Sequence, residues 1–398
     1  MRRLVVIFTL VLLSVEARAN DPDPDADVRS VIDRGLTFLA KDNLAWKESK
    51  KCYECHHAPF TIWALNEAKN RGYVVDDKVL AELTSWVVGE DYLARLIPKR
   101  TEQKEIVLHE APLLLALGLE AGDTKATQDG LKQMLASVVH DQGQDGSWKR
   151  VNEARPILSS PDTLTTLALL ALSAPNAPDL GEEGKAAKQK GLQWLQAASS
   201  DDELQPAAFR LILWCRLGRP PAEWEPLAQQ LQKAQNDDGG WGQLKQAKSD
   251  AFATGQTLYA LAEAGAKSDD AAVRKAQSFL AKSQGKDGAW TMTSRAIMGN
   301  GKVATKFEPI THASSAWAVM GLVRSAPAEI KPVEPSKGTD TFATAAESPD
   351  YFSAAASAGS ALSSAFVGSG GAGGLSWPSS GLPMNLAIAW RVICVTVC

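Results

Sequence analysis

Three loops of one pattern recur along the chain and constrain its fold more than any other feature. Each runs Gln-x-x-Asp-Gly-x-Trp, and the copies occupy residues 142–148, 235–241 and 284–290. Each follows a segment with the apolar spacing of an amphipathic helix and precedes a second segment rich in Ala and Leu. The Asp-Gly pair supplies a tight turn, because glycine tolerates a positive φ. We expect the Gln and Trp side chains to tie neighbouring hairpins together by a hydrogen bond and a stacked ring.

The same helix-turn-helix spacing continues outside these loops. It gives six hairpins, at about 28–72, 78–122, 127–174, 185–218, 223–266 and 270–326. The second helix of a hairpin is apolar on nearly every face, and a helix of this kind is buried. The sequence therefore predicts an all-α fold: an α/α toroid of about six helical hairpins whose second helices form an inner ring.

The Gln-x-x-Asp-Gly-x-Trp loops resemble the repeat of the squalene–hopene cyclase and prenyltransferase superfamily, over roughly residues 28–326. That resemblance implies the toroid fold and, as one function, an enzyme acting on an apolar substrate in the central cavity. The Asp-x-Asp-Asp acid motif of those cyclases does not occur in the chain. The candidate acids are Asp162 and Asp250, near inner-helix starts, where a helix N-cap is the ordinary role of an aspartate. The resemblance thus predicts shape, and catalysis does not follow from it.

A second motif points to different chemistry. Residues 52–56 read Cys-x-x-Cys-His, the attachment pattern of c-type haem. Cys52 and Cys55 would form thioethers to the haem, and His56 would be the axial ligand of the iron. The motif occupies the connection of the first hairpin, where other hairpins carry the Asp-Gly loop. We therefore expect haem c bound covalently there.

Histidines at other helix starts extend this hypothesis. His109 and His312 open the second helices of the second and sixth hairpins. If the ring closes, the sixth hairpin lies beside the first, and His56, His57, His109 and His312 gather on one arc of one rim. His109 and His312 are then alternative distal ligands of the haem iron.

Two other interpretations of the motif stay open. Cys52 and Cys55 with one or two histidines also fit a zinc site, since Cys-x-x-Cys is a zinc-binding pattern. Alternatively, the two cysteines form a short disulfide. The leading function is therefore an exported haem-binding toroid with an electron-transfer or haem-linked redox role and a redox partner protein. The alternatives are the terpenoid-cyclase or prenyltransferase-like enzyme and a zinc- or disulfide-stapled interaction scaffold.

The N-terminal residues predict export. Arg2 and Arg3 precede an apolar run at residues 4–13, and a small-residue cleavage site ends near Ala19. This pattern predicts a signal peptide over 1–19 and a periplasmic or secreted protein. The run is too short for a stable membrane-spanning helix.

Composition divides the remainder of the chain. We expect a short acidic and Pro-containing linker at 20–27, the toroid at 28–330 and a low-complexity, disordered tail at 331–398. The formal net charge is -4 and no basic block occurs, which excludes an electrostatic footprint for nucleic acid. No transmembrane segment is expected in the mature chain.

Overall fold

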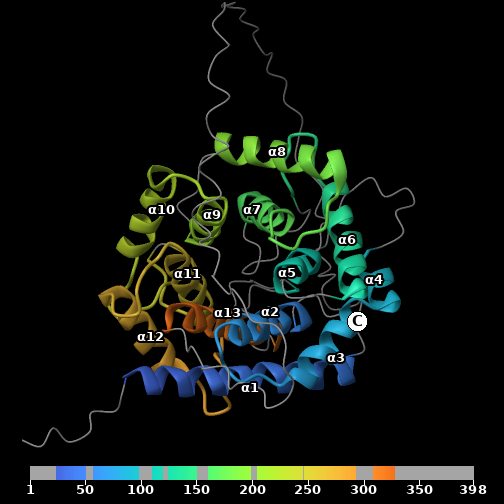
Figure 1. Cartoon of the computed structure of the whole chain (residues 1–398). Helices are drawn as coiled ribbons and strands as arrows, with labels where there is room; N and C mark the ends of the chain where they lie inside the picture. The colour runs from blue at the N-terminus through green and yellow to red at the C-terminus, as the bar shows by residue number, and fades with distance from the viewer. Residues whose placement is uncertain are drawn as a thin grey trace, which may run out of the picture.

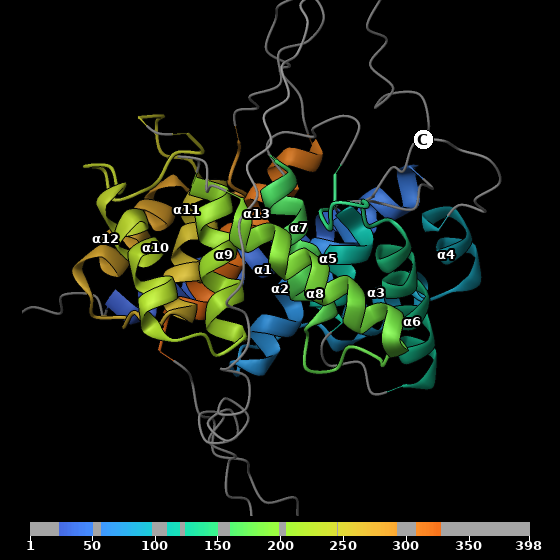
Figure 2. The same cartoon turned by 90° about the horizontal axis from the view of Figure 1, so that it is seen from above.

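The computed structural model describes residues 24–50, 57–97, 110–119, 124–149, 160–198, 204–244, 246–292 and 308–327. Within these ranges the regular elements are thirteen helices, and they form an outer and an inner layer around a common centre (Figure 1). Figure 2 shows the same ring from above, with α8 facing the viewer. The prediction of an all-α toroid is confirmed.

The outer layer carries the first helix of each hairpin and one short additional helix, α4, that the sequence pattern did not predict. These helices are amphipathic, so they bury one stripe and leave the other in water. Their bounds are α1 (Pro24–Lys50), α3 (Asp77–Val87), α4 (Glu90–Leu96), α6 (Lys125–His140), α8 (Gly181–Ala197), α10 (Pro221–Lys233) and α12 (Ala271–Ser283).

The inner layer carries the second helices. In α7 every residue from Asp162 to Leu172 is buried, as the apolar pattern predicted. Each inner helix contacts the next, and the last contacts the first, so the inner ring is closed. Its members are α2 (His57–Asn70), α5 (Glu110–Gly118), α7 (Pro161–Leu172), α9 (Leu204–Arg216), α11 (Ala251–Glu263) and α13 (Glu308–Ser325).

The three repeated loops act as joints between hairpins. In the first copy, the Nε2 of Gln142 donates to the carbonyl of Gly146 in its own loop and to that of Ala187 in α8, both at 2.8 Å. The indole of Trp148 donates to Val138 at the end of α6, and its backbone N–H donates to Thr165 in α7. One loop therefore joins its outer helix, its inner helix and the next hairpin, which confirms the predicted role of the glutamine.

The third copy closes the ring. The Nε2 of Gln284 donates to the carbonyl of Val31 in α1 at 2.9 Å, and the Nη2 of Arg34 donates to the Oε1 of Gln284 at 2.6 Å. Gly288 has φ 87°, and a Cβ there would lie 2.4 Å from the carbonyl oxygen of Arg34. The sixth hairpin thus packs against the first, as the ring model required.

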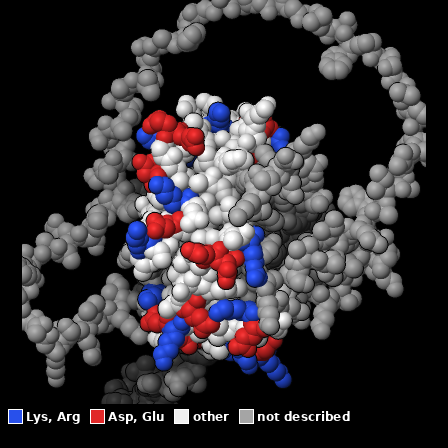
Figure 3. Space-filling model, turned by 90° about the vertical axis from the view of Figure 1, so that its right-hand side faces the viewer, with Lys and Arg blue, Asp and Glu red and all other residues white. Residues whose placement is uncertain are grey.

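The outer surface carries mixed charge. On the face drawn in Figure 3, acidic and basic side chains of the described residues alternate, and neither sign forms a continuous block. This face therefore presents no patch of a single sign among the described residues that would attract a polyanion.

Candidate functional site

All the inner helices begin at one rim of the ring and end at the other. We call the first the start rim; it carries His57, Asp162, Asp250 and His312. The second is the end rim. The start rim gathers the N–H groups at the helix beginnings, and side chains cap some of them, as Ser160 caps Thr163 and Asp250 caps Ala253.

Three side chains from distant parts of the chain meet on the start rim. Asp42 comes from α1, His57 is the first residue of α2, and His312 lies in the first turns of α13. The Oδ2 of Asp42 lies 2.7 Å from the Nδ1 of His312 and 3.5 Å from the Nε2 of His57. One ligand atom from each residue lies within 4.8 Å of the other two. Carboxylate oxygen and imidazole nitrogen are ligands of divalent transition metals.

The surrounding packing fixes both imidazole rings. The ring of His57 is stacked on Trp46, with centroids 4.0 Å apart, and its other neighbour is the ring of His312 at 4.2 Å. The Nε2 of His312 is hydrogen-bonded to the hydroxyl of Thr61 at 2.9 Å. The His57 and His312 side chains are fully buried, whereas 32% of the Asp42 side chain is exposed. The cluster therefore opens to solvent on its carboxylate side.

The charge state of Asp42 follows from these neighbours. Burial on its own would raise the pKa of this carboxyl group. Hydrogen bonds and the positive charges of His312 and His57 outweigh burial and hold the pKa of Asp42 well below its usual value. The carboxylate is thus negative under ordinary conditions and ready to accept a cation.

The predicted histidine arc is confirmed in part. His57 and His312 lie side by side, which required the ring closure assumed from the sequence. Cys52, Cys55, His56 and His109 lie outside the described residues, so their predicted roles stay predictions. Asp42 was not predicted as a site residue; it lies on one face of α1 together with Phe38 and Trp46, at four-residue spacing. That spacing was the one available signal.

The two candidate acids have ordinary structural partners. Asp162 is buried in the first turn of α7 and forms an ion pair with Arg210 of α9, whose guanidinium contacts both carboxylate oxygens. Asp250 is the N-cap of α11; its side chain accepts from the N–H of Ala253 at 2.8 Å and from Gln243 at 2.9 Å. Both carboxylates therefore act as hydrogen-bond acceptors, and this geometry does not favour either as a proton donor to a substrate.

The centre of the inner ring is filled by aromatic rings from four inner helices. Trp317 of α13 lies edge-on to its neighbours, with ring centroids 5.2 Å from Trp63, 5.6 Å from Phe209 and 6.0 Å from Tyr259. We call these residues and Phe60, which also contacts Trp317, the aromatic centre. At the start rim, a small cavity of about 10 Å³ lies between α9 and α11, bounded by residues that include Leu204, Gln205 and Phe252. It holds roughly one water molecule.

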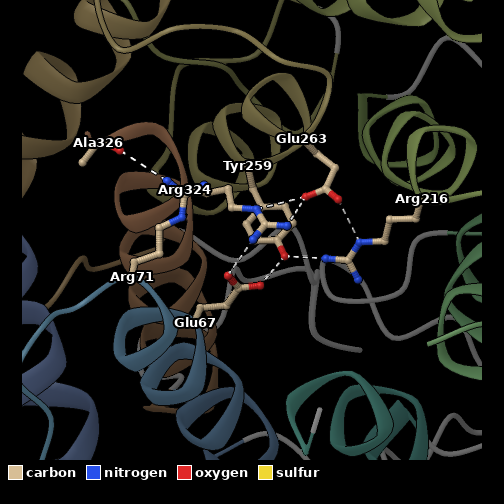
Figure 4. Close-up of polar contacts among 7 residues, drawn as sticks. All are labelled: Glu67, Arg71, Arg216, Tyr259, Glu263, Arg324 and Ala326. Atoms are coloured by element: carbon tan, nitrogen blue, oxygen red, sulfur yellow. Dashed lines mark hydrogen bonds and ion pairs between the residues drawn. The ribbon is translucent and has the colours of Figure 1, made fainter. Parts of the chain in front are cut away.

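The end rim carries a buried ionic network that the sequence analysis did not identify (Figure 4). Arg324 of α13 donates to Glu263 of α11 and to Glu67 of α2, and Arg216 of α9 donates to Glu263 at 3.1 Å. The hydroxyl of Tyr259 donates to Glu67 at 2.5 Å and accepts from Arg216 at 2.7 Å. Four inner helices are joined by these contacts.

Burial and charge set the ionisation of this network. Burial raises the pKa of Tyr259 well above its usual value, and the carboxylates of Glu67 and Glu263 reinforce the shift against Arg216 and Arg324. Burial would also raise the pKa of Glu263, but Arg216 and Arg324 outweigh it and lower that pKa. Glu263 is therefore held ionised beside two guanidinium groups, next to a neutral Tyr259 phenol, which is a structural arrangement.

Fold and rim together define the class: an α/α toroid in which Asp42 of outer helix α1 meets His57 and His312 near the beginnings of two inner helices. Residues 229–367 match the family described as the squalene-hopene cyclase C-terminal domain. No protein of established description matches the chain.

Solved structures share the fold at low identity. A possible member of the GH105 family from Salmonella enterica has a TM-score of 0.53 at 14% identity, covering 80% of this chain and 98% of its own. A variant of the type II terpene cyclase MstE from Scytonema, in complex with its substrate geranylgeranyl dihydroxybenzoate, has a TM-score of 0.50 at 14% identity, covering 77% and 99%. These similarities concern the fold alone, since the two neighbours differ in their described classes.

The leading functional expectation from the sequence, a haem-based redox protein, is wrong. The cyclase-domain match and the terpene cyclase neighbours point to a cyclase-like toroid, the alternative that the repeat loops indicated. The error lay in inferring the function from a five-residue motif with three fixed positions, which is less specific than a loop repeated three times at hairpin spacing.

Within the described ranges, no helix is both long and apolar enough to cross a bilayer.

Proposed function

We propose that this protein is a terpene-cyclase-like enzyme that acts on an apolar substrate of the isoprenoid class. The observation that carries the proposal is the match of residues 229–367 to the squalene-hopene cyclase C-terminal domain. The matched region includes α11 and α13, which supply Tyr259 and Trp317 to the aromatic centre. Aromatic faces stabilise positive charge, and a cyclising isoprenoid develops that charge along its chain.

The start rim is the expected entrance for the substrate. The cavity there is far smaller than an isoprenoid, so binding has to separate the beginnings of α9 and α11, whose Leu204 and Phe252 line it. Asp162 and Asp250 stay the candidate acids on this rim. Proton donation by Asp162 requires that the substrate first displaces Arg210 from its carboxylate. The contributions of Asp162 and Asp250 to proton donation can therefore be measured separately, by replacing each aspartate in turn.

The test is incubation of the purified full chain with squalene and, separately, with geranylgeranyl dihydroxybenzoate. Cyclisation conserves mass, so products are identified by changed chromatographic retention and fragmentation. We expect a cyclic product from at least one substrate. Binding is followed independently by the fluorescence of Trp63 and Trp317, which a bound substrate at the aromatic centre alters.

Matched variants localise the chemistry. Trp317→Phe, in the aromatic centre, should lower product formation without unfolding the protein, whereas Trp224→Phe on outer helix α10 should not. Asp162→Asn and Asp250→Asn identify the proton donor, because the variant that lacks it should form no product. Absence of both binding and product with either substrate, from a folded protein, overturns the proposal.

A further inference from the structure

We propose that Asp42, His57 and His312 form a binding site for a divalent transition-metal ion, with zinc as the expected occupant. The three ligands come from α1, α2 and α13, so only the closed ring brings them together. The inference goes beyond the proposed isoprenoid chemistry and does not depend on it, because it rests on these three side chains alone.

The distances suit a single ion. Zinc binds imidazole nitrogen and carboxylate oxygen at about 2.0–2.2 Å in tetrahedral geometry, which separates neighbouring ligand atoms by roughly 3.3 Å. The Asp42 Oδ2 to His57 Nε2 distance is 3.5 Å, close to that separation. The 2.7 Å contact between Asp42 Oδ2 and His312 Nδ1 has to widen by about 0.6 Å to admit an ion, a small movement for a half-exposed carboxylate.

Neighbouring side chains orient the two histidine ligands. Thr61 binds the Nε2 of His312 at 2.9 Å, which leaves the Nδ1 of that ring to face Asp42 and the ion. Metal-binding histidines generally have such a partner on the other ring nitrogen, because it fixes the tautomer and the ring orientation. Stacking on Trp46 holds His57 in place on the other side. The ligands are thus positioned before an ion arrives.

The donor set also suits an ion. Two buried imidazole rings with centroids 4.2 Å apart face one carboxylate. Two imidazole nitrogens and one carboxylate oxygen gathered in this way are typical ligands of a divalent transition-metal ion.

The exposed side of Asp42 gives the ion both a path and a free coordination position. Both imidazoles are buried, so solvent reaches the cluster past the carboxylate. Three protein ligands with one open position are the arrangement of catalytic rather than structural zinc sites. The fourth ligand is expected to be water, which a substrate group can replace.

The test is titration of the chelator-treated full chain with Zn²⁺ against a chromophoric chelator. We expect one ion per chain and a raised melting temperature of the metal-loaded protein. Co²⁺ provides a second readout: ligation by nitrogen and oxygen gives tetrahedral visible bands without the intense near-ultraviolet thiolate bands that cysteine ligation produces. This readout separates the proposed site from one built on Cys52 and Cys55.

Graded variants locate the ion. Thr61→Val removes the hydrogen-bond partner of the His312 ligand and should weaken Zn²⁺ binding by about 10–100-fold. His312→Asn and Asp42→Asn each remove a ligand itself, so they should weaken binding by more than about 100-fold. His140→Ala is the matched control: it lies 3.6 Å from Asp141 in another His-Asp pair, on the exposed end of α6. That variant should bind as the parent does.

Two outcomes overturn the inference. One is stoichiometric Zn²⁺ binding that survives Asp42→Asn and His312→Asn in folded protein. The other is the absence of any binding or thermal shift in the parent chain. The His312 side chain is buried, so His312→Asn can unfold the protein. Asp42→Asn replaces a partly exposed side chain by one of the same size, so this variant should fold and keeps the test decisive.

Discussion

Arg210 of α9 is a buried cation, and its guanidinium pairs with the carboxylate of Asp162 in α7. The side chains of Arg210 and Asp162 are 9% and 6% exposed, so solvent cannot replace the lost charge. We therefore expect Asp162→Ala to lower the free energy of unfolding by about 3–5 kcal/mol, measured by urea denaturation.

A double variant separates this effect from cavity formation. Replacing Asp162 and Arg210 together by Leu and Met should cost much less than Asp162→Ala, because no unpaired charge is left behind. Equal losses in the two proteins would contradict the ion-pair account and attribute the effect to packing.

Cys215 shows how burial lowers the reactivity of a thiol. Burial in α9 raises the pKa of its thiol to about 12, with a further contribution from the charge of Glu263. The thiolate is the reactive form, so at pH 8 we expect Cys215 to resist an alkylating reagent in the native protein. Peptide mass spectrometry should find it modified only after denaturation. Rapid native labelling at this residue would mean that the end of α9 opens readily.

At the scale of the element, two glycines with positive φ separate the cost of backbone strain from the cost of a steric clash. Gly288 lies in a repeated loop, and Gly265 follows the end of α11. Gly288 and Gly265 have similar φ values of 87° and 91°, but a Cβ at Gly288 would strike the carbonyl of Arg34, whereas nothing lies within 4 Å of one at Gly265. Gly265→Ala should therefore cost only the backbone strain, about 1–2 kcal/mol. Gly288→Ala should cost clearly more in the same urea experiment; equal costs would mean that α1 moves aside freely.

Local patterns explain which elements the sequence predicted correctly. The Gln-x-x-Asp-Gly-x-Trp loops hold their own hairpins through contacts 4 to 17 residues apart, so their pattern is visible along the chain. Inner helices were recognisable because burial on all faces removes polar residues. The short α4 carries no such pattern and was missed.

The candidate site was harder to predict because its partners are distant. Asp42 meets His312 across 270 residues, and Glu67 meets Arg324 across 257. An aspartate on an otherwise ordinary outer helix gives no sign of a partner so far away. His312 was found only because ring closure was assumed, and that assumption cannot identify which residue of α1 faces it.

At the scale of the molecule, the end-rim network makes stability depend on pH. Glu263 has a pKa below its usual value of 4.5 in the folded state, so the folded protein holds this carboxylate ionised more strongly than the unfolded chain does. The associated stability is present above pH 4.5 and is lost as the pH falls through the lower, folded-state pKa.

We therefore expect the urea midpoint to fall as the pH is lowered below about 4.5. Glu263→Gln should be less stable at neutral pH and should show a shallower fall in that range. Glu223→Gln is a suitable comparison, because that exposed carboxylate pairs with Arg219 on the surface. If the urea midpoint of the Glu263→Gln variant falls with pH as steeply as that of the parent protein, the acid sensitivity arises from other groups.

Ring closure predicts that a change at the contact between the first and last hairpins lowers the stability of both. Gln284→Ala removes the hydrogen bonds to Val31 and Arg34, whereas Gln142→Ala removes an equivalent bond to Ala187 inside the array. We expect each to cost about 1 kcal/mol per bond lost. Hydrogen exchange should quicken in both α1 and α12 after Gln284→Ala, and faster exchange confined to one of them would contradict a closed ring.

A row of hairpins has two free ends, and stacked repeats normally fray from them. Here the contacts of Gln284 with α1, and the meeting of Asp42 with His312, join the two ends. The circle has no terminus from which to fray, so disorder has to begin by breaking a joint. Translation also delivers the closing partner last, and the nascent chain stays an open arc until α13 has been synthesised.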